Sequence, residues 1–132
     1  MKPVKHIYPN QKDVWEKASK FLVDKFSKEP AVKELIVWAS LAEEKFGLYE
    51  RTYNGMEGSD IDLVIVIDER KTLPKEWKFT TVVKSWFDLY HLGSFEYQGH
   101  KHTIDGLIVS PSRHNMEKMN ESLKGRSRKI YG

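Results

Sequence analysis

Apolar residues recur at three- and four-residue steps between Asp13 and Lys28, which is the spacing of one face of a helix. This pattern predicts an amphipathic helix that Asp13 caps, with Glu16 three residues later, and that Pro30 ends. Shorter helices are expected at Leu41–Phe46, from Pro74 through Trp77, and at Asn115–Leu123.

The clearest strand runs from Ile61 to Ile67, where branched apolar residues are nearly continuous and indicate a central strand covered on both faces. Further strands are expected at Leu35–Ala39, Ser94–Gln98 and His102–Val109, with a turn near Gly99-His100. A long loop with the turn signal Asn54-Gly55 precedes the clearest strand. The order of elements predicts an α/β (α+β) fold, with a mixed four- to five-stranded sheet and helices mainly on one face.

The length of 132 residues predicts a single domain over residues 1–132. Hydrophobic residues make up 39% and charged residues 31%, a globular rather than a disordered composition. No apolar run approaches the roughly 20 residues that cross a bilayer, and no signal peptide is indicated at the start, so no membrane partner is expected. The chain has no cysteine, which removes disulfides and thiolate metal sites and fits a cytoplasmic protein.

The formal net charge of +3 is compatible with an anionic substrate such as a nucleoside triphosphate. Nucleic acid is compatible with it too but is not indicated. Several of the basic residues lie in the segment from Lys124 to Lys129. A solvated tail is the preferred interpretation of that segment, with a phosphate or RNA contact as the alternative.

Two carboxylates stand at the start of the central strand. Because side chains alternate along a strand, Asp60 and Asp62 point to the same side. Two like charges at a buried position are costly unless a divalent cation lies between them, and carboxylate oxygens suit Mg²⁺ or Mn²⁺. A loop cap explains Asp60 equally well, but it does not explain Asp62 inside the apolar run. The flexible Gly58-Ser59 before them would allow close approach to a ligand.

Two-metal phosphoryl transfer needs a further acid on a neighbouring strand. Asp105 is the best candidate, since it is a lone acid inside the apolar run Ile104–Val109. Its alternative is a solvent-facing residue on an edge strand. Asp88 is the rival for the same role.

The stretch Ser59-Asp60-Ile61-Asp62-Leu63 resembles the Ser-Asp-x-Asp-Leu motif of the DNA polymerase beta-like nucleotidyltransferase superfamily, above all its small stand-alone members. Leu35–Ser40 is similar to the strand before that motif, and Ile104–Pro111 to the strand of the third acid. The resemblance extends to the last helix and tail. It implies a nucleotidyltransferase-like fold, with Asp60, Asp62 and Asp105 as metal-binding and catalytic residues.

In that family a Gly-Ser pair and the basic residues after it hold the triphosphate. Ala39-Ser40 stands at this position here, and the segment from Ser40 to Asp60 is longer than the family's usual loop. The resemblance therefore makes Ser40 and Ser59 the expected nucleotide contacts, with Lys45 and Arg51 as cations that could neutralise phosphate. Ordinary surface charge is the alternative for these two cations.

These observations predict a metal-dependent nucleotidyltransferase that moves a nucleoside monophosphate from a nucleoside triphosphate to an unidentified acceptor hydroxyl. The cofactor would be Mg²⁺ or Mn²⁺. The alternative is a catalytically impaired nucleotidyltransferase-fold module, antitoxin-like, that acts through a protein partner. Small family members often pair with a helical partner protein, so such a partner is the second expectation from the resemblance.

Other residues with metal-binding or base-stacking chemistry have plainer explanations. His100 and His102 have the spacing of metal ligands on one strand face, but no third ligand is evident nearby. Trp15 and Trp38 are expected in the core, while Trp77 and Trp86 are left open. Tyr49 and Tyr53, in the expected long loop, are the better candidates for a ring that faces the substrate.

Overall fold

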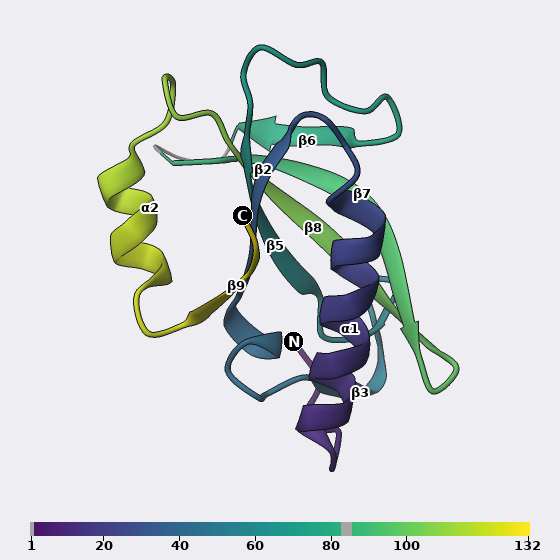
Figure 1. Ribbon diagram of the computed structural model, residues 1–132. Helices are drawn as coiled ribbons and strands as arrows, with labels where there is room; N and C mark the ends of the chain where they lie inside the picture. The colour runs from purple at the N-terminus through teal and green to yellow at the C-terminus, as the bar shows by residue number, and fades with distance from the viewer. Residues whose placement is uncertain (1, 83–85) are drawn as a thin grey trace.

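Strand β5 (Ile61–Ile67) lies inside a six-stranded mixed sheet in the computed structural model, which describes residues 2–82 and 86–132 (Figure 1). Strand β5 pairs antiparallel with β2 (Val32–Trp38) on one side and parallel with β8 (His100–Val109) on the other. Strands β7 (Asp88–Tyr97) and β6 (Lys78–Val82) continue the sheet beyond β8, and β9 (Ser127–Tyr131) closes it beyond β2. The bounds predicted for β5 are therefore confirmed, but the expectation of four to five strands is wrong.

The two helices cover opposite faces of this sheet (Figure 1). Helix α1 (Gln11–Phe26) packs its buried side chains against odd-numbered residues of β5, such as Leu63 and Ile65. Helix α2 (Met116–Leu123) packs Met119 and Leu123 against the even-numbered Val64 and Val66. Because successive residues of a strand point to opposite faces, the helices cannot share one face. The expectation of helices mainly on one face is corrected accordingly.

The segment expected to be a long loop forms strands β3 (Gly47–Tyr53) and β4 (Met56–Gly58). Asn54 and Gly55 make the turn between them with φ of 49° and 77°, which is the backbone that an Asn-Gly hairpin turn requires. Strand β1 (Lys5–Ile7) pairs with β3, so these three strands form a second small sheet. Only a short 3₁₀ turn, η1 (Ala39–Leu41), is present where a helix from Leu41 to Phe46 was expected.

The helix expected after Pro74 is also absent: a turn at Pro74–Trp77 leads directly into β6. The β-branched residues Thr80 and Thr81 explain this outcome, because they favour a strand over a helix. The basic segment from Lys124 to Lys129 is largely exposed, as expected, but from Ser127 onward it belongs to β9, which pairs with β2, and is not a free tail. Helix α1 begins two residues earlier than predicted, since the side chain of Asn10, not of Asp13, accepts the capping hydrogen bond.

The remaining predicted strands and the last helix are present, but β2 begins three residues, β7 six residues and β8 two residues earlier than predicted. The hairpin of β7 and β8 turns at Gln98-Gly99, and α2 begins after Asn115, whose side chain caps it. Trp77 and Trp86, which the sequence left open, are among the buried core residues. The expectation that Trp15 and Trp38 lie in the core is corrected, because both are only partly buried at its margin. Within the described residues, no helix is both long enough and apolar enough to cross a bilayer.

Candidate functional site

Strand pairing brings together three of the predicted acidic residues. In the parallel pair of β5 and β8, Asp62 lies directly beside Asp105. Asp60 precedes β5 on the same face as Asp62, because the two residues have the same parity along the strand. Continuing across the sheet, Asp105 lies opposite His91 of β7. One face of the sheet therefore carries a row that runs from Asp62 through Asp105 to His91.

The three carboxyl groups affect one another's protonation. Burial and the charge of Asp105 raise the pKa of Asp60 to about 6. Burial, followed by the charges of Asp105 and Asp60, raises the pKa of Asp62 to about 7. Burial also raises the pKa of Asp105, while a hydrogen bond with Asp60 and the charge of His91 act against it. Mutual perturbation of this kind requires the three carboxyl groups to lie close together.

The chemistry of this group fits a hard divalent cation. One carboxylate oxygen of Asp60, Oδ1, is buried and has no hydrogen-bond partner among the described residues. An unpaired buried carboxylate oxygen is costly, and a cation that accepts oxygen ligands would offset that cost. Among residues 2–82 and 86–132, however, no three His, Cys, Asp or Glu side chains are placed so that they could hold a metal ion. The three acids supply the oxygen donors that such a cation prefers, but they are not arranged as a metal site.

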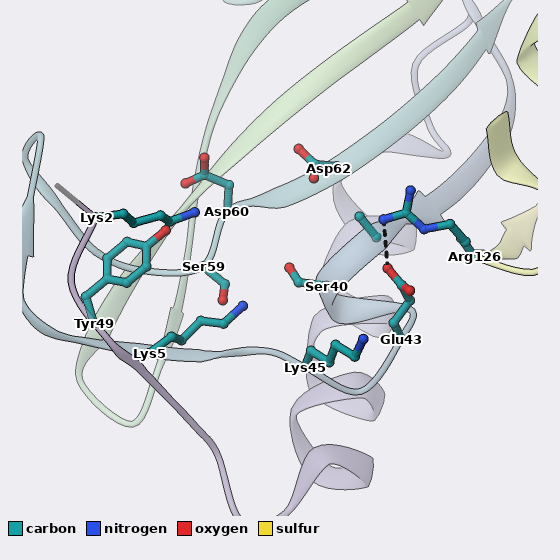
Figure 2. Close-up of a pocket in the computed structure, with 11 residues that line it drawn as sticks. Lys2, Lys5, Ser40, Glu43, Lys45, Tyr49, Ser59, Asp60, Asp62 and Arg126 are labelled. Carbon is teal, nitrogen blue, oxygen red and sulfur yellow. Dashed lines mark hydrogen bonds and ion pairs between the residues drawn. The ribbon is translucent and has the colours of Figure 1, made fainter.

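A cavity of about 350 Å³ opens beside Asp60 and Asp62 (Figure 2). Its residues come from β1 and the segment before it, η1 and the loop that follows, β3, the link from β4 into the start of β5, and the turn before β9. The two acids lie on the sheet side of this cavity. Its other charged lining residues include four cations, which are Lys2, Lys5, Lys45 and Arg126. The cavity therefore places negative and positive charge side by side, as a metal-bound phosphate compound would require.

Arg126 is held at the cavity by three contacts. Its guanidinium forms an ion pair with Glu43 at 3.1 Å and lies 5.6 Å from the ring of Trp38. The hydrogen bond from Arg126 lowers the pKa of Glu43. The backbone carbonyl of Arg126 accepts a hydrogen bond from the N–H of Ala39 at 3.0 Å. The basic segment that was expected to be solvated thus delivers one cation to the candidate site.

Ser40, which the resemblance makes an expected nucleotide contact, lines the cavity directly after a residue with unusual backbone geometry. Ala39 has a φ of 62°, in the left-handed region that favours glycine. The backbone at Ala39 is therefore glycine-like, although the residue carries a methyl group. An L-residue in this region is strained, and such strain is common at functional sites.

Ser59 and the residues around it act as a scaffold beneath Asp60. The Ser59 hydroxyl lines the cavity and accepts a hydrogen bond from the Gly47 N–H at 3.1 Å. The Ser59 carbonyl accepts one from Nδ1 of the buried His102 at 2.8 Å. The other ring nitrogen of His102, Nε2, accepts a hydrogen bond from the Tyr8 hydroxyl at 2.7 Å. This network fixes a neutral His102, whose pKa burial lowers, behind the strand that carries the acids.

Gly58 lies where the backbones of β3 and β4 pack closely against each other. A side chain at Gly58 would overlap the carbonyl oxygen of Gly47, so β4 requires glycine there to approach β3. The close approach expected for Gly58 is therefore made to the protein's own backbone.

Arg51 and Tyr53 are not among the residues that line the cavity. Arg51 is exposed on β3, two residues beyond Tyr49, which does line the cavity. Tyr53 packs edge-on against Tyr49, with ring centroids 6.0 Å apart. Lys45, by contrast, lies at the cavity as expected.

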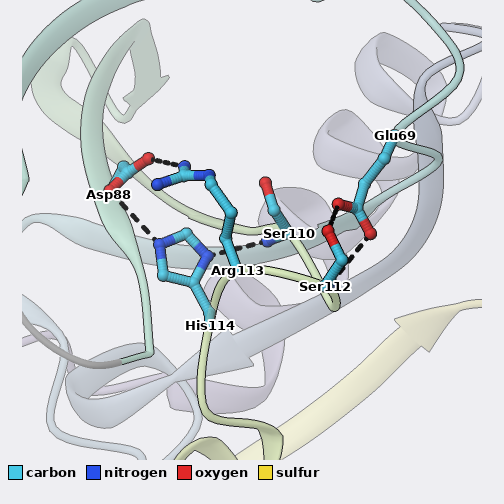
Figure 3. A network of polar contacts seen from close by, with 6 residues as sticks. All are labelled: Glu69, Asp88, Ser110, Ser112, Arg113 and His114. Carbon is cyan, nitrogen blue, oxygen red and sulfur yellow. Dashed lines mark hydrogen bonds and ion pairs between the residues drawn. The ribbon is translucent and has the colours of Figure 1, made fainter.

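Asp88 belongs to a different polar network (Figure 3). Its buried carboxylate accepts hydrogen bonds from Arg113 and, at 3.2 Å, from Nε2 of His114. Nδ1 of His114 accepts a hydrogen bond from the backbone N–H of Ser110 at 2.9 Å, so both ring nitrogens of His114 have a hydrogen-bond partner. Asp88 lies opposite Ile108 in the hairpin, three residues along β8 from Asp105. Of the two rivals for the third carboxylate, only Asp105 lies beside Asp62.

The two histidines with metal-like spacing do not act together. His100 contacts the exposed Glu57 at 3.1 Å, whereas His102 is fully buried in the Ser59 network. Each histidine therefore has a hydrogen-bond partner of its own, and no shared metal ion is needed to explain the pair.

Comparison with known proteins adds no relative: no family model matches the chain, and no curated protein or solved structure shows a significant match. The site is therefore interpreted from its own geometry.

Sequence reasoning missed three of the four cations of the cavity, Lys2, Lys5 and Arg126. They lie far from the acidic motif along the chain, and no local pattern distinguishes them from surface charge. The run of basic residues around Arg126 was the only available signal.

Proposed function

We propose that this protein is a cytoplasmic, metal-dependent nucleotidyltransferase. The observation that carries the proposal is the electrostatic coupling of Asp60, Asp62 and Asp105 beside a cavity lined with cations. Coupled, partly buried carboxylates in a cleft are typical of functional sites. The motif Ser59–Leu63 gives the same interpretation independently of the geometry.

In this proposal Asp60, Asp62 and Asp105 hold Mg²⁺ or Mn²⁺. The ions, when bound, would neutralise phosphate charge and polarise the reacting phosphorus–oxygen bonds. The Ser40 hydroxyl donates to a phosphate oxygen, and Lys45 neutralises phosphate charge. The acceptor oxygen forms a bond to the α-phosphorus of the nucleoside triphosphate, and the bond from that phosphorus to pyrophosphate breaks. A carboxylate oxygen of Asp105 takes the proton of the acceptor hydroxyl.

The test compares metal-dependent nucleotide binding and transfer between the wild-type protein and Asp62→Asn. We expect the wild-type protein to bind ATP in the presence of Mg²⁺ and to transfer label from [α-³²P]ATP to an acceptor in fractionated cell extract. Asp62→Asn should lose both properties, because a neutral amide is a poor ligand for a hard cation. Asp24→Asn, an exposed acid on α1 paired with Lys20, is the control and should behave as wild type. Equal nucleotide binding by Asp62→Asn and wild type would exclude the enzyme.

One observation favours a second candidate, a binding module of the same fold that acts through a protein partner. Ala39 places a methyl group at the lining of the cavity, where the family has glycine. If that methyl blocks the phosphate, Ala39→Gly should restore transfer that the wild-type protein lacks. Wild-type transfer at a rate unaffected by Ala39→Gly would exclude this second candidate.

A further inference from the structure

The chain segment before α1 forms part of the candidate site. Lys5 pairs with Tyr49 in the register of β1 and β3. The carbonyl of Val4 accepts the N–H of Glu50 at 2.8 Å, and the N–H of Tyr8 donates to the carbonyl of Phe46 at 2.9 Å. Backbone hydrogen bonds therefore hold this segment on both sides of Lys5.

Three amino groups point from this side toward the cavity (Figure 2). Lys2 and Lys5 come from the N-terminal segment, and Lys45 comes from the loop after η1. The amino group of Lys2 lies 5.4 Å from the ring centroid of Tyr49, a cation–π contact that positions it at the cavity.

These three lysines form no ion pair with a described residue, although the charge of Lys2 acts to lower the pKa values of Asp60 and Asp62, and that of Lys45 acts to lower the pKa of Glu43. Among the described residues, none of the three forms an ion pair with a carboxylate, whereas the fourth cation of the cavity, Arg126, is paired with Glu43. Burial lowers the pKa of Lys5, and the charges of Lys2 and Lys45 lower it further. Three amines that repel one another around one cavity are stabilised by a ligand with several negative charges.

We propose that Lys2, Lys5 and Lys45 form a polyphosphate subsite, which binds a linear di- or triphosphate chain without requiring a metal ion. The subsite rests on the proposed function in one respect: the triphosphate of the nucleotide substrate is its natural occupant. Lys2 and Lys5 of the N-terminal segment then add phosphate contacts to those of Ser40 and Lys45, and they take the place of Arg51, which does not line the cavity. Compact ammonium groups on flexible stems suit phosphate oxygens of this kind.

The probe is inorganic tripolyphosphate, titrated calorimetrically into the full chain at low salt with EDTA present. Lys2→Met/Lys5→Met keeps the aliphatic stems and removes two charges, and we expect it to weaken binding by at least about tenfold. Lys71→Met/Lys75→Met removes the same charge at exposed positions away from the cavity and should change binding by less than about twofold. Lys2→Arg/Lys5→Arg keeps both charges and should retain binding.

Unchanged binding by Lys2→Met/Lys5→Met, or an equal loss in the Lys71→Met/Lys75→Met control, would overturn the subsite. Absence of tripolyphosphate binding by the wild-type protein would overturn it too. Asp62→Asn separates the subsite from the proposed function, because it should bind tripolyphosphate in EDTA at least as tightly as wild type while losing nucleotide transfer. Lysine-dependent binding without any transfer would leave the subsite and exclude the enzyme. Nucleotide transfer that does not depend on Lys2 and Lys5 would leave the enzyme and exclude the subsite.

Discussion

Ala39 adopts a left-handed backbone conformation that residues with a side chain disfavour. Its φ of 62° costs an L-residue roughly 1–2 kcal/mol, and glycine adopts the same conformation without that cost. Ala39→Gly should therefore raise the free energy of unfolding by about 1 kcal/mol, as measured by urea denaturation. Ala42→Gly is the matched control: its φ is −68°, so glycine there should lower stability by roughly 0.5–1 kcal/mol. Equal destabilisation by both would show that residue 39 is not strained.

The raised pKa values of Asp60 and Asp62 determine the direction in which folding stability changes with pH. Without metal, Asp62 has a pKa of about 7 in the folded state against an ordinary value of 3.8, and Asp60 a pKa of about 6. The folded state therefore binds more protons than the unfolded state between about pH 4 and pH 7, so these groups make stability fall as the pH rises through that range. The buried His102 acts in the opposite direction, because its pKa is lowered.

His102 is present in both wild type and Asp62→Asn, so the difference in stability between the two proteins reports the effect of the Asp62 carboxylate alone. In EDTA, Asp62→Asn should gain thermal stability relative to wild type as the pH rises from 5 to 8, and added Mg²⁺ should narrow that gap by stabilising wild type alone. Melting curves at several pH values measure the effect. A stability difference that stays constant across this range would mean that Asp62 is not held in a repulsive environment.

At the scale of elements, Asp88 fastens β7 to the turn that precedes α2. Its buried carboxylate accepts hydrogen bonds from Arg113 and His114, so Asp88→Ala leaves both donors without their partner. We expect it to lower the free energy of unfolding by about 2 kcal/mol. Metal-dependent nucleotide binding by the folded fraction should stay unchanged. Asp105→Ala is the counterpart: it should abolish nucleotide binding without lowering stability, because it removes a charge that repels Asp60 and Asp62. The reverse pattern would make Asp88 the third carboxylate.

Elements with a strong local pattern were predictable, and those defined by distant partners were not. The continuous branched residues of β5 gave its bounds directly, and the periodicity of α1 gave its extent to within two residues. Strand β9 carries Arg128 and Lys129, so its sequence gives the charge pattern of a tail. It is a strand because the exposed edge of β2 offers it hydrogen bonds.

The other misses at this scale have similar causes. Pro74 is a common first residue of helices, yet β-branched residues follow too closely for a helix to continue. Strands β3 and β4 surround a turn that the sequence signalled at Asn54-Gly55, but their many polar side chains concealed the strands themselves.

At the scale of the whole molecule, the site is assembled by topology. The sequence identified Asp62 and Asp105 separately, each as an acid within an apolar run. Only the parallel pairing of β5 with β8 places them side by side. The cations show the limit of prediction more clearly, because Lys5 and Arg126 come from opposite ends of the chain and meet at one cavity. No pattern within either segment encodes that meeting.

The same assembly divides the charge of the cavity between elements. The acids belong to the central sheet, which the core holds on both faces, whereas three of the cations lie on peripheral segments. The proposed nucleotidyl transfer depends on this arrangement, in which carboxylates on the sheet face cations from peripheral segments.

The most direct test of the central claim is the position of Mn²⁺ in a crystal soaked with MnCl₂, located by its anomalous scattering. The account predicts an ion within roughly 2.2 Å of carboxylate oxygens from Asp60, Asp62 and Asp105. The same soak of Asp62→Asn crystals should show no ion there. Wild-type crystals in which the three carboxylates stay apart with no ion between them, or in which Mn²⁺ binds elsewhere, would contradict it.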